Sequence, residues 1–265
     1  MKITSWPTLS LHPAVTAVLQ GVLNLVLVWW FPRLPAPLYL GLWWVFALAI
    51  ASGLSLITYY APGASRARQL VTLAFAYAGL ALLLLVADSP VAWWFTSVLV
   101  VMGPAVGWLL LPWEATLTFG LKPERRWRLL LTAFGVLGVW SSARGMIFFQ
   151  LLSPPAWWLP WLVGTLIVGA VSLWWWWEYG VNLDRRTYLT LGIFLLMMFE
   201  ITGAAGWLPW GYLTSGVAFT VIWYVGWLLL RFYLSPGGID WRRQRWLLLG
   251  AGATLTGFLA IVRWR

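Results

Sequence analysis

The chain has 265 residues, of which 62% are hydrophobic and 9% charged, and its formal net charge is +10 at pH 7. Soluble domains carry about a quarter charged residues, and a soluble fold of this length could not bury so much apolar surface. The composition therefore excludes an ordinary soluble domain and predicts an integral membrane protein. In such a protein, the positive charge indicates orientation and contact with anionic lipids rather than nucleic-acid binding.

Nine apolar segments follow one another along the chain, each long enough to cross a hydrocarbon core of about 30 Å. The connections between them are short and rich in turn-forming residues, as in "FPRLPAP" and "LLSPPAWW". None could hold a separate soluble domain, so we expect one all-α transmembrane domain, a polytopic helical bundle, over residues 1–265. The predicted spans are 14–31, 38–60, 69–87, 91–113, 127–150, 156–178, 187–206, 210–233 and 246–262.

The basic residues fall mostly on one side of this predicted topology. If the N-terminus is cytoplasmic, three arginines lie outside, Arg144 lies within a span, and the other basic residues lie in cytoplasmic segments. Cytoplasmic loops are enriched in Lys and Arg, so this bias predicts a cytoplasmic N-terminus in a prokaryotic-type plasma (inner) membrane. The cytoplasmic set is Lys2, Arg66, Arg68, Lys122, Arg125, Arg126, Arg128, Arg185, Arg186, Arg231, Arg242, Arg243 and Arg245.

The helices expected to enter from the cytoplasm begin alike, with "SRARQL", "PERRWR", "LDRRTY" and "DWRRQR" at similar spacing. The recurrence favours a fourfold helical-hairpin repeat. The alternative is that two spans and two short loops give this period in any tightly looped membrane protein.

Tryptophan is abundant, with 25 residues, and it clusters at the predicted span ends. An amphipathic indole belongs at the headgroup level of a bilayer. The pattern favours an interfacial belt, with a tryptophan-lined ligand or pigment pocket as the alternative. The clusters are Trp29 and Trp30, Trp93 and Trp94, Trp157 and Trp158, Trp174 to Trp177, and Trp207 and Trp210.

Several kinds of chemistry lack the residues that they need. The chain has no cysteine and one histidine, His12, and its two lysines, Lys2 and Lys122, lie outside the predicted spans. This excludes thiol catalysis, Cys-ligated centres and paired histidine ligands of a membrane haem. No phosphate-binding glycine-rich loop precedes a helix. We therefore expect no cofactor, no metal and no catalytic residue, and the sequence leans away from an enzyme.

Two charged residues, Arg144 and Glu200, lie within predicted spans and are the main candidate site residues. Counted from Arg128 and from Arg186 at about 1.5 Å per residue, they lie about 24 Å and about 21 Å along their helices. Each charge alone would cost about 2.5–3.5 kcal/mol in the membrane. We therefore expect them to form an ion pair or to face a polar cavity, with Gln150 in an outer vestibule. The pair is either a structural clamp or a site for a ligand or proton.

Two further sets of polar residues are candidates. Gln20 and Asn24 lie four residues apart on the first span, which favours hydrogen bonds to other helices. Basic residues at the inner surface are candidates for binding anionic lipid headgroups, although they also serve as a topology signal. They are Lys122, Arg125, Arg126, Arg128, Arg242, Arg243 and Arg245.

Three functions remain open. In the first, a site at Arg144 and Glu200 binds or translocates a lipid or a small anionic ligand. In the second, the chain is a non-catalytic structural or assembly subunit of a larger membrane complex, as its short loops and many tryptophans favour. In the third, it is a lipid-modifying enzyme that uses carboxylates, arginines and water. The expected partners are the lipid bilayer, anionic lipids and other membrane protein chains, without nucleic acid.

Overall fold

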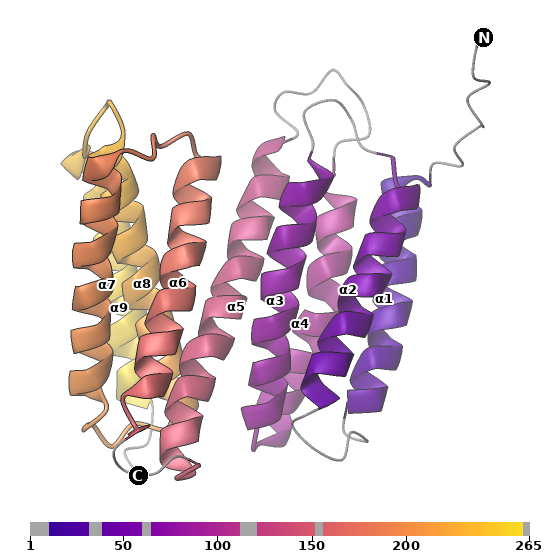
Figure 1. Ribbon diagram of the computed structural model, residues 1–265, viewed down its shortest axis with the longest axis horizontal. Coiled ribbons are helices and arrows are strands. Elements are labelled where there is room, and N and C mark those ends of the chain that lie inside the picture. Colours follow the sequence, from indigo (N-terminus) through magenta and orange to yellow (C-terminus); the bar gives the residue numbers. More distant parts are fainter. Residues whose placement is uncertain (1–10, 32–38, 60–64, 112–120, 152–155, 262–265) are drawn as a thin grey trace. The chain divides into compact units, whose positions relative to one another are not determined.

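The computed structural model describes the chain except residues 1–10, 32–38, 60–64, 112–120, 152–155 and 262–265. Its described part is all-helical, with nine α-helices and no β-strand (Figure 1). The helices are α1 (Pro13–Trp30), α2 (Tyr39–Ile57), α3 (Arg66–Val86), α4 (Pro90–Leu109), α5 (Leu121–Phe148), α6 (Leu159–Glu178), α7 (Arg185–Ala205), α8 (Tyr212–Leu234) and α9 (Trp241–Ile261).

The nine helices lie at the nine predicted spans. Seven of them, α1 and α3 to α8, are long and apolar enough to cross a membrane. The predicted all-α, membrane-type architecture is therefore confirmed. That α2 and α9 also cross the bilayer stays a prediction, and so does the hairpin repeat.

Local sequence signals explain where several helices begin. The side chains of Ser65, Ser89 and Asp184 each accept a hydrogen bond from the amide three residues further along. These caps satisfy amides that the first turn of a helix leaves without an internal partner. Pro13 and Pro90 stand at the first positions of α1 and α4, where proline has the required φ and needs no amide hydrogen.

The helices form two compact units, Met1–Gly135 and Val136–Arg265. The boundary falls inside α5, so the N-terminal part of that helix belongs to the first unit and its C-terminal part to the second. No feature of the sequence predicts this division. A single transmembrane domain over residues 1–265 stays a prediction.

In the first unit, α1 packs against α2 and α4, and α3 packs against α2 and α4. Trp43, Tyr77 and Trp108 are fully buried in its core. The helices α3 and α5 approach closely, because a Cβ added at Gly79 would collide with the backbone of Gly135. Such small residues let helix backbones meet in membrane proteins.

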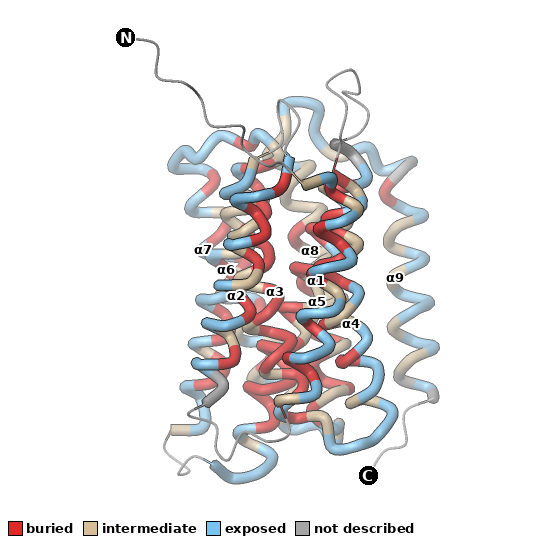
Figure 2. Tube along the Cα trace, turned by 90° about the vertical axis from the view of Figure 1, so that its right-hand side faces the viewer, coloured by how far each residue is buried: buried red, intermediate tan, exposed pale blue. Residues whose placement is uncertain are grey.

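In the second unit, α7 packs against α6 and α8, and α8 packs against α9. Aromatic rings of α6 and α8 fill the core, where Trp223 donates a hydrogen bond to Ser172 Oγ at 2.9 Å. Trp175 and Trp176 are also buried within the protein; that they lie at the level of the membrane interface stays a prediction. Along α9, by contrast, most described side chains are exposed (Figure 2), and Gln244 is the one that is buried.

Candidate functional site

Arg144 lies in the C-terminal half of α5, and only 9% of the residue is exposed. Its Nη1 donates to the carbonyl oxygen of Gly206 at 2.7 Å, and its Nη2 donates to that of Leu208 at 3.1 Å. Gly206 caps the C-terminal end of α7, which carries partial negative charge, and Leu208 lies in the turn that follows. Arg144 therefore links α5 to the end of α7.

No carboxylate balances the charge of Arg144 in the part of the chain that the structure describes. A guanidinium has five N–H donors, and the two carbonyls use only two of them. The Nε of Arg144 is buried and has no hydrogen-bond partner. The arginine is thus held by dipoles and keeps its positive charge without a counter-ion.

A cavity of about 250 Å³ lies beside Arg144, within the second unit. Most of its wall is aromatic, and the rings of Trp157 and Trp207 meet edge to face at 5.4 Å between centroids. We call it the Arg144 cavity. It is lined by Arg144, Ile147, Trp157, Trp158, Trp161, Phe199, Gly203, Gly206 and Trp207.

Two glycines of the "TGAAG" stretch leave room in this cavity. A Cβ added at Gly203 would meet nothing within 4 Å. A Cβ added at Gly206 would lie 2.9 Å from the carbonyl oxygen of Gly203 and 3.7 Å from Arg144 Nη1. Gly206 therefore allows the tight backbone turn at the end of α7, whereas Gly203 leaves open space.

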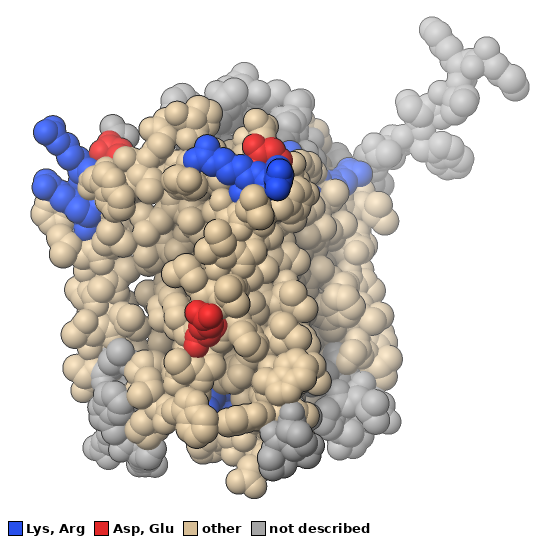
Figure 3. Space-filling view, turned by 60° about the vertical axis from the view of Figure 1, so that its left-hand side comes forward, with Lys and Arg blue, Asp and Glu red and all other residues tan. Residues whose placement is uncertain are grey.

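Glu200 does not pair with Arg144, so the predicted ion pair is wrong. Its side chain is exposed, whereas the buried face of α7 contains Phe194, Met198 and Thr202. A helix turns about 100° per residue, so a position two residues from both Met198 and Thr202 lies on the opposite side. The prediction used only the position of Glu200 along the helix axis. It did not consider the direction in which the side chain points. Figure 3 shows acidic side chains at the helix ends and also partway along the flank.

Gln150 is not among the residues that line the Arg144 cavity. It is exposed and has a φ of 52°, at the turn that ends α5. The amide of the next residue, Leu151, donates to the carbonyl of Met146 at 2.9 Å. A left-handed residue with such a bond closes many helices, usually with glycine at that position. The structure thus places Gln150 in a helix cap.

Gln20 and Asn24 are fully buried in the first unit and form hydrogen bonds to two other helices. Gln20 Nε2 donates to Tyr77 Oη at 2.9 Å, and the Tyr77 hydroxyl donates to Asn24 Oδ1 at 3.0 Å. Asn24 Nδ2 donates to the Val100 carbonyl at 2.8 Å, and Trp108 Nε1 donates to Gln20 Oε1 at 3.3 Å. These bonds satisfy the two amides and connect α1 with α3 and α4.

The predicted headgroup residues lie near helix starts, and basic side chains gather near helix ends in Figure 3. Arg126, Arg242 and Arg245 are exposed and Arg125 is half-buried. Arg128 is buried and forms an ion pair with Glu124, with Nε 2.7 Å from Oε1. The side chains of Lys122 and Arg243 lie outside the described residues. Lipid binding by this set stays a prediction.

Sequence reasoning missed the wall of the Arg144 cavity. The available signal was the recurrence of aromatic pairs, "PAWW" before α6 and "GWLPW" after α7, which were interpreted mainly as an interfacial belt. Among the described residues, no group of three or more His, Asp or Glu side chains could hold a metal ion. No protein family, curated protein or solved structure matches the chain. The geometry at Arg144 is therefore the guide to function.

Proposed function

We propose that the second unit binds an amphiphile with an acidic head, a carboxylate or a phosphate, in the Arg144 cavity. The observation that carries the proposal is a buried cation that has no carboxylate partner among the described residues and that lines an aromatic cavity. A buried charge is costly unless it is paired. The anionic head of a ligand would supply the missing counter-ion and accept charge-assisted hydrogen bonds from the guanidinium.

The cavity wall favours an amphiphile over a small inorganic anion. Apart from Arg144 and two glycines, the lining consists of Ile147, Phe199 and four tryptophans. A hydrocarbon chain that covers this wall buries apolar surface, which favours binding. A volume of about 250 Å³ is smaller than typical sites for drug-sized ligands, which hold about 300–1,000 Å³. The cavity thus suits the head and first methylenes of a lipid acid, with the rest of its chain outside.

Quenching of tryptophan fluorescence by brominated amphiphiles tests this proposal. The purified protein in neutral detergent is titrated with brominated dodecanoate and with the corresponding uncharged dodecanol. We expect tighter binding of the acid, and an Arg144→Gln substitution should weaken acid binding about tenfold, the equivalent of one charge-assisted hydrogen bond. Equal affinity for acid and alcohol, or no effect of Arg144→Gln, would exclude the proposed site.

Filling the cavity is a second test that leaves Arg144 in place. Gly203→Leu puts a side chain into open space beside Arg144, whereas Gly192→Leu does so on the exposed side of the same helix. Neither Cβ meets an atom within 4 Å, so both variants should fold. We expect Gly203→Leu to abolish quenching by the acid and Gly192→Leu to leave it unchanged. Retention of binding in both variants would place the ligand elsewhere.

We also propose that all nine helices cross a plasma (inner) membrane with the N-terminus in the cytoplasm. The supporting observation is that the starts of α3, α5, α7 and α9 carry most of the arginines. The chain has no cysteine, so single cysteines can be labelled cleanly. An impermeant external reagent should modify a cysteine at Ser89 and not one at Asn182, and the reverse result would invert the proposed topology.

A second candidate function is that of a subunit in a larger membrane complex, which the position of Glu200 favours. The exposed side of α7 also carries Ile193, Leu196 and Met197, so a carboxyl group lies on an apolar surface. A charge facing hydrocarbon costs about 2.5–3.5 kcal/mol, and a donor on a partner helix would offset this cost. A photo-crosslinker at Leu196 in intact membranes should then capture one protein through its wild-type surface and lose it in Glu200→Gln. A crosslinker at the exposed Leu166 of α6 is the control, and crosslinks to lipid alone would argue against a subunit.

A further inference from the structure

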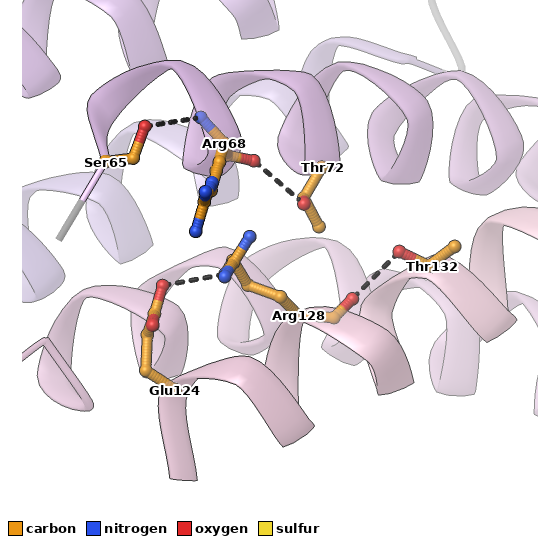
Figure 4. Close-up of polar contacts among 6 residues, drawn as sticks. All are labelled: Ser65, Arg68, Thr72, Glu124, Arg128 and Thr132. Carbon is orange, nitrogen blue, oxygen red and sulfur yellow. Dashed lines mark hydrogen bonds and ion pairs between the residues drawn. The ribbon is translucent and has the colours of Figure 1, made fainter. Parts of the chain in front are cut away.

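Two arginines of the first unit point toward one another across the gap between α3 and α5. Figure 4 shows the guanidinium groups of Arg68 and Arg128 facing each other, with Glu124 beside Arg128. The Arg128 Nε lies 2.7 Å from Glu124 Oε1, and both of these side chains are almost completely buried. Arg68 is half-buried. The three residues thus form one charged cluster near the start of both helices.

The backbone holds the two arginines in matching positions. Thr72 Oγ1 donates to the carbonyl of Arg68 at 2.9 Å, and Thr132 Oγ1 donates to the carbonyl of Arg128 at 2.9 Å (Figure 4). Each arginine is therefore followed, one turn later, by the same threonine contact. Further along, the close approach of Gly79 to Gly135 sets the spacing of α3 and α5. The guanidinium groups meet because these two helices are held together.

The cluster carries more positive than negative charge. It contains two guanidinium groups and one carboxylate, so its formal charge is positive by one unit. It also lies near the N-terminal ends of α3 and α5, which carry the positive end of the helix dipole. The several oxygens of a single anion suit two guanidinium groups that face each other. Arginine forks match the geometry of phosphate oxygens particularly well.

We propose that Arg68 and Arg128 form a binding site for a phosphate group, with Glu124 holding the guanidinium of Arg128 in position. We call it the Arg68–Arg128 site. It differs from general attraction between basic loops and a lipid surface, because two particular residues bind one group. The phosphate is either that of a lipid headgroup or a free phosphate ion. The site belongs to the first unit and does not depend on ligand binding in the Arg144 cavity.

Thermal unfolding of the purified protein in neutral detergent tests the Arg68–Arg128 site. The probes are inorganic phosphate and short-chain phosphatidylglycerol, each compared with sodium chloride at equal ionic strength. We expect at least one probe to raise the midpoint of unfolding of the wild type. Arg68→Gln should weaken this binding about tenfold or more, as loss of one charge-assisted contact implies. Arg126→Gln removes the same charge from an exposed position of α5 and should bind as the wild type does.

Replacing Arg128 alone breaks a buried ion pair and risks a failure to fold, so a double variant is used to test its role in phosphate binding. Glu124→Gln with Arg128→Gln removes both members of the buried ion pair, so it leaves no charge alone, and it should fold and lose phosphate binding. A response to inorganic phosphate would identify a site for the free ion, and a response to the lipid alone would identify a headgroup site. Equal weakening by Arg68→Gln and Arg126→Gln, undiminished binding by the double variant, or no response beyond that to sodium chloride would overturn the proposal.

Discussion

Arg128 and Arg144 lie on the same helix, one in each unit, and both are more than nine-tenths buried. Arg128 has a carboxylate partner at 2.7 Å. Arg144 instead donates to the backbone carbonyls of Gly206 and Leu208. A buried cation can thus be stabilised by a formal charge or by dipoles. The first arrangement makes the protein's own stability depend on the pair, and the second leaves a positive charge available to a ligand.

Buried side-chain atoms without a hydrogen-bond partner occur in both units. In the first unit they include Gln69 Oε1 and Ser97 Oγ, although the amides of Gln20 and Asn24 are hydrogen-bonded within the fold. In the second unit they include the Nε of Arg144. Such atoms are infrequent in native proteins and need an explanation. Arg144 lines a cavity, so a polar ligand or water there would supply one.

The largest expected change in the free energy of unfolding comes from replacing Arg128, the arginine with a carboxylate partner. Arg128→Gln breaks the buried ion pair of the Glu124 carboxylate, so it should lower the free energy of unfolding by about 3–5 kcal/mol. Changing Glu124 to Gln as well should recover most of that loss. Denaturant titration in detergent, followed by tryptophan fluorescence, measures both values. A double variant as unstable as the single one would show that the pair does not govern stability.

A smaller change in the free energy of unfolding is expected from replacing Arg144, which is held by backbone carbonyls. In ligand-free protein, Arg144→Gln loses one charge-assisted hydrogen bond, worth about 1.5–3 kcal/mol, because the single amide nitrogen of glutamine replaces only one of the two donor nitrogens. It also removes a buried charge that costs about 2.5–3.5 kcal/mol. The two contributions nearly cancel, so the free energy of unfolding should change by about 1 kcal/mol or less. The same titration measures it, and a loss as large as that of Arg128→Gln would remove the contrast between the two sites.

A double-mutant cycle sharpens the comparison further by testing whether Glu200 acts as the missing carboxylate. Since the two side chains form no ion pair, Glu200→Gln and Arg144→Gln should be additive within about 0.5 kcal/mol. Glu200→Gln alone should not lower the free energy of unfolding, because it removes a charge from an apolar surface and breaks no ion pair. Coupling well above about 0.5 kcal/mol would restore the ion pair predicted from the sequence.

The smallest expected effect is on the titration of Asp184. Its carboxylate accepts a hydrogen bond from a backbone amide, whereas the Arg144 guanidinium donates to backbone carbonyls. The amide of Thr187 donates to Asp184 Oδ1 at 2.8 Å, and this bond lowers the pKa of Asp184 below its ordinary value of 3.8. A lowered pKa means that the carboxylate stabilises the start of α7 above the unfolded pKa and loses this effect as pH falls through the folded value. The amide-proton shift of Thr187 should therefore titrate with a midpoint below 3.8. Asp184→Asn keeps a cap without a charge and should abolish the titration; a midpoint at or above 3.8 would contradict the bond.

Much of the fold could be predicted because it is determined locally. Apolar runs between proline, glycine and arginine residues located the helices, although α5 and α9 begin at Leu121 and Trp241, several residues before the predicted starts at 127 and 246. The polar stripe at Gln20 and Asn24 was also visible, because residues four apart share a helix face. The partners of that stripe, Tyr77 and Trp108, were not predicted, since hydrogen bonds between distant residues depend on how the helices pack.

The candidate site was predicted in part. Arg144 was identified because a charge within a span needs a polar partner. The choice of Glu200 was wrong because depth was estimated from the helical rise, whereas contact also depends on rotation about the helix axis. Two residues of sequence correspond to about 200° of rotation, which is enough to move a side chain from the interior to the surface. The Gly206 and Leu208 carbonyls were missed, since every residue has a carbonyl and the sequence does not mark which ones are left unpaired.

The sequence by itself therefore determined the membrane-type architecture, the positions of the helices and the identity of the buried cation, Arg144. Hydrophobicity and helix-end signals act over a few residues, so their effect can be read from neighbours along the chain. Only the tertiary structure decided that Trp175 and Trp176 are buried, that Arg68 faces Arg128, and that Arg144 meets the end of α7 beside an aromatic cavity. Those contacts join segments far apart in the chain, and they depend on the rotation and spacing of packed helices.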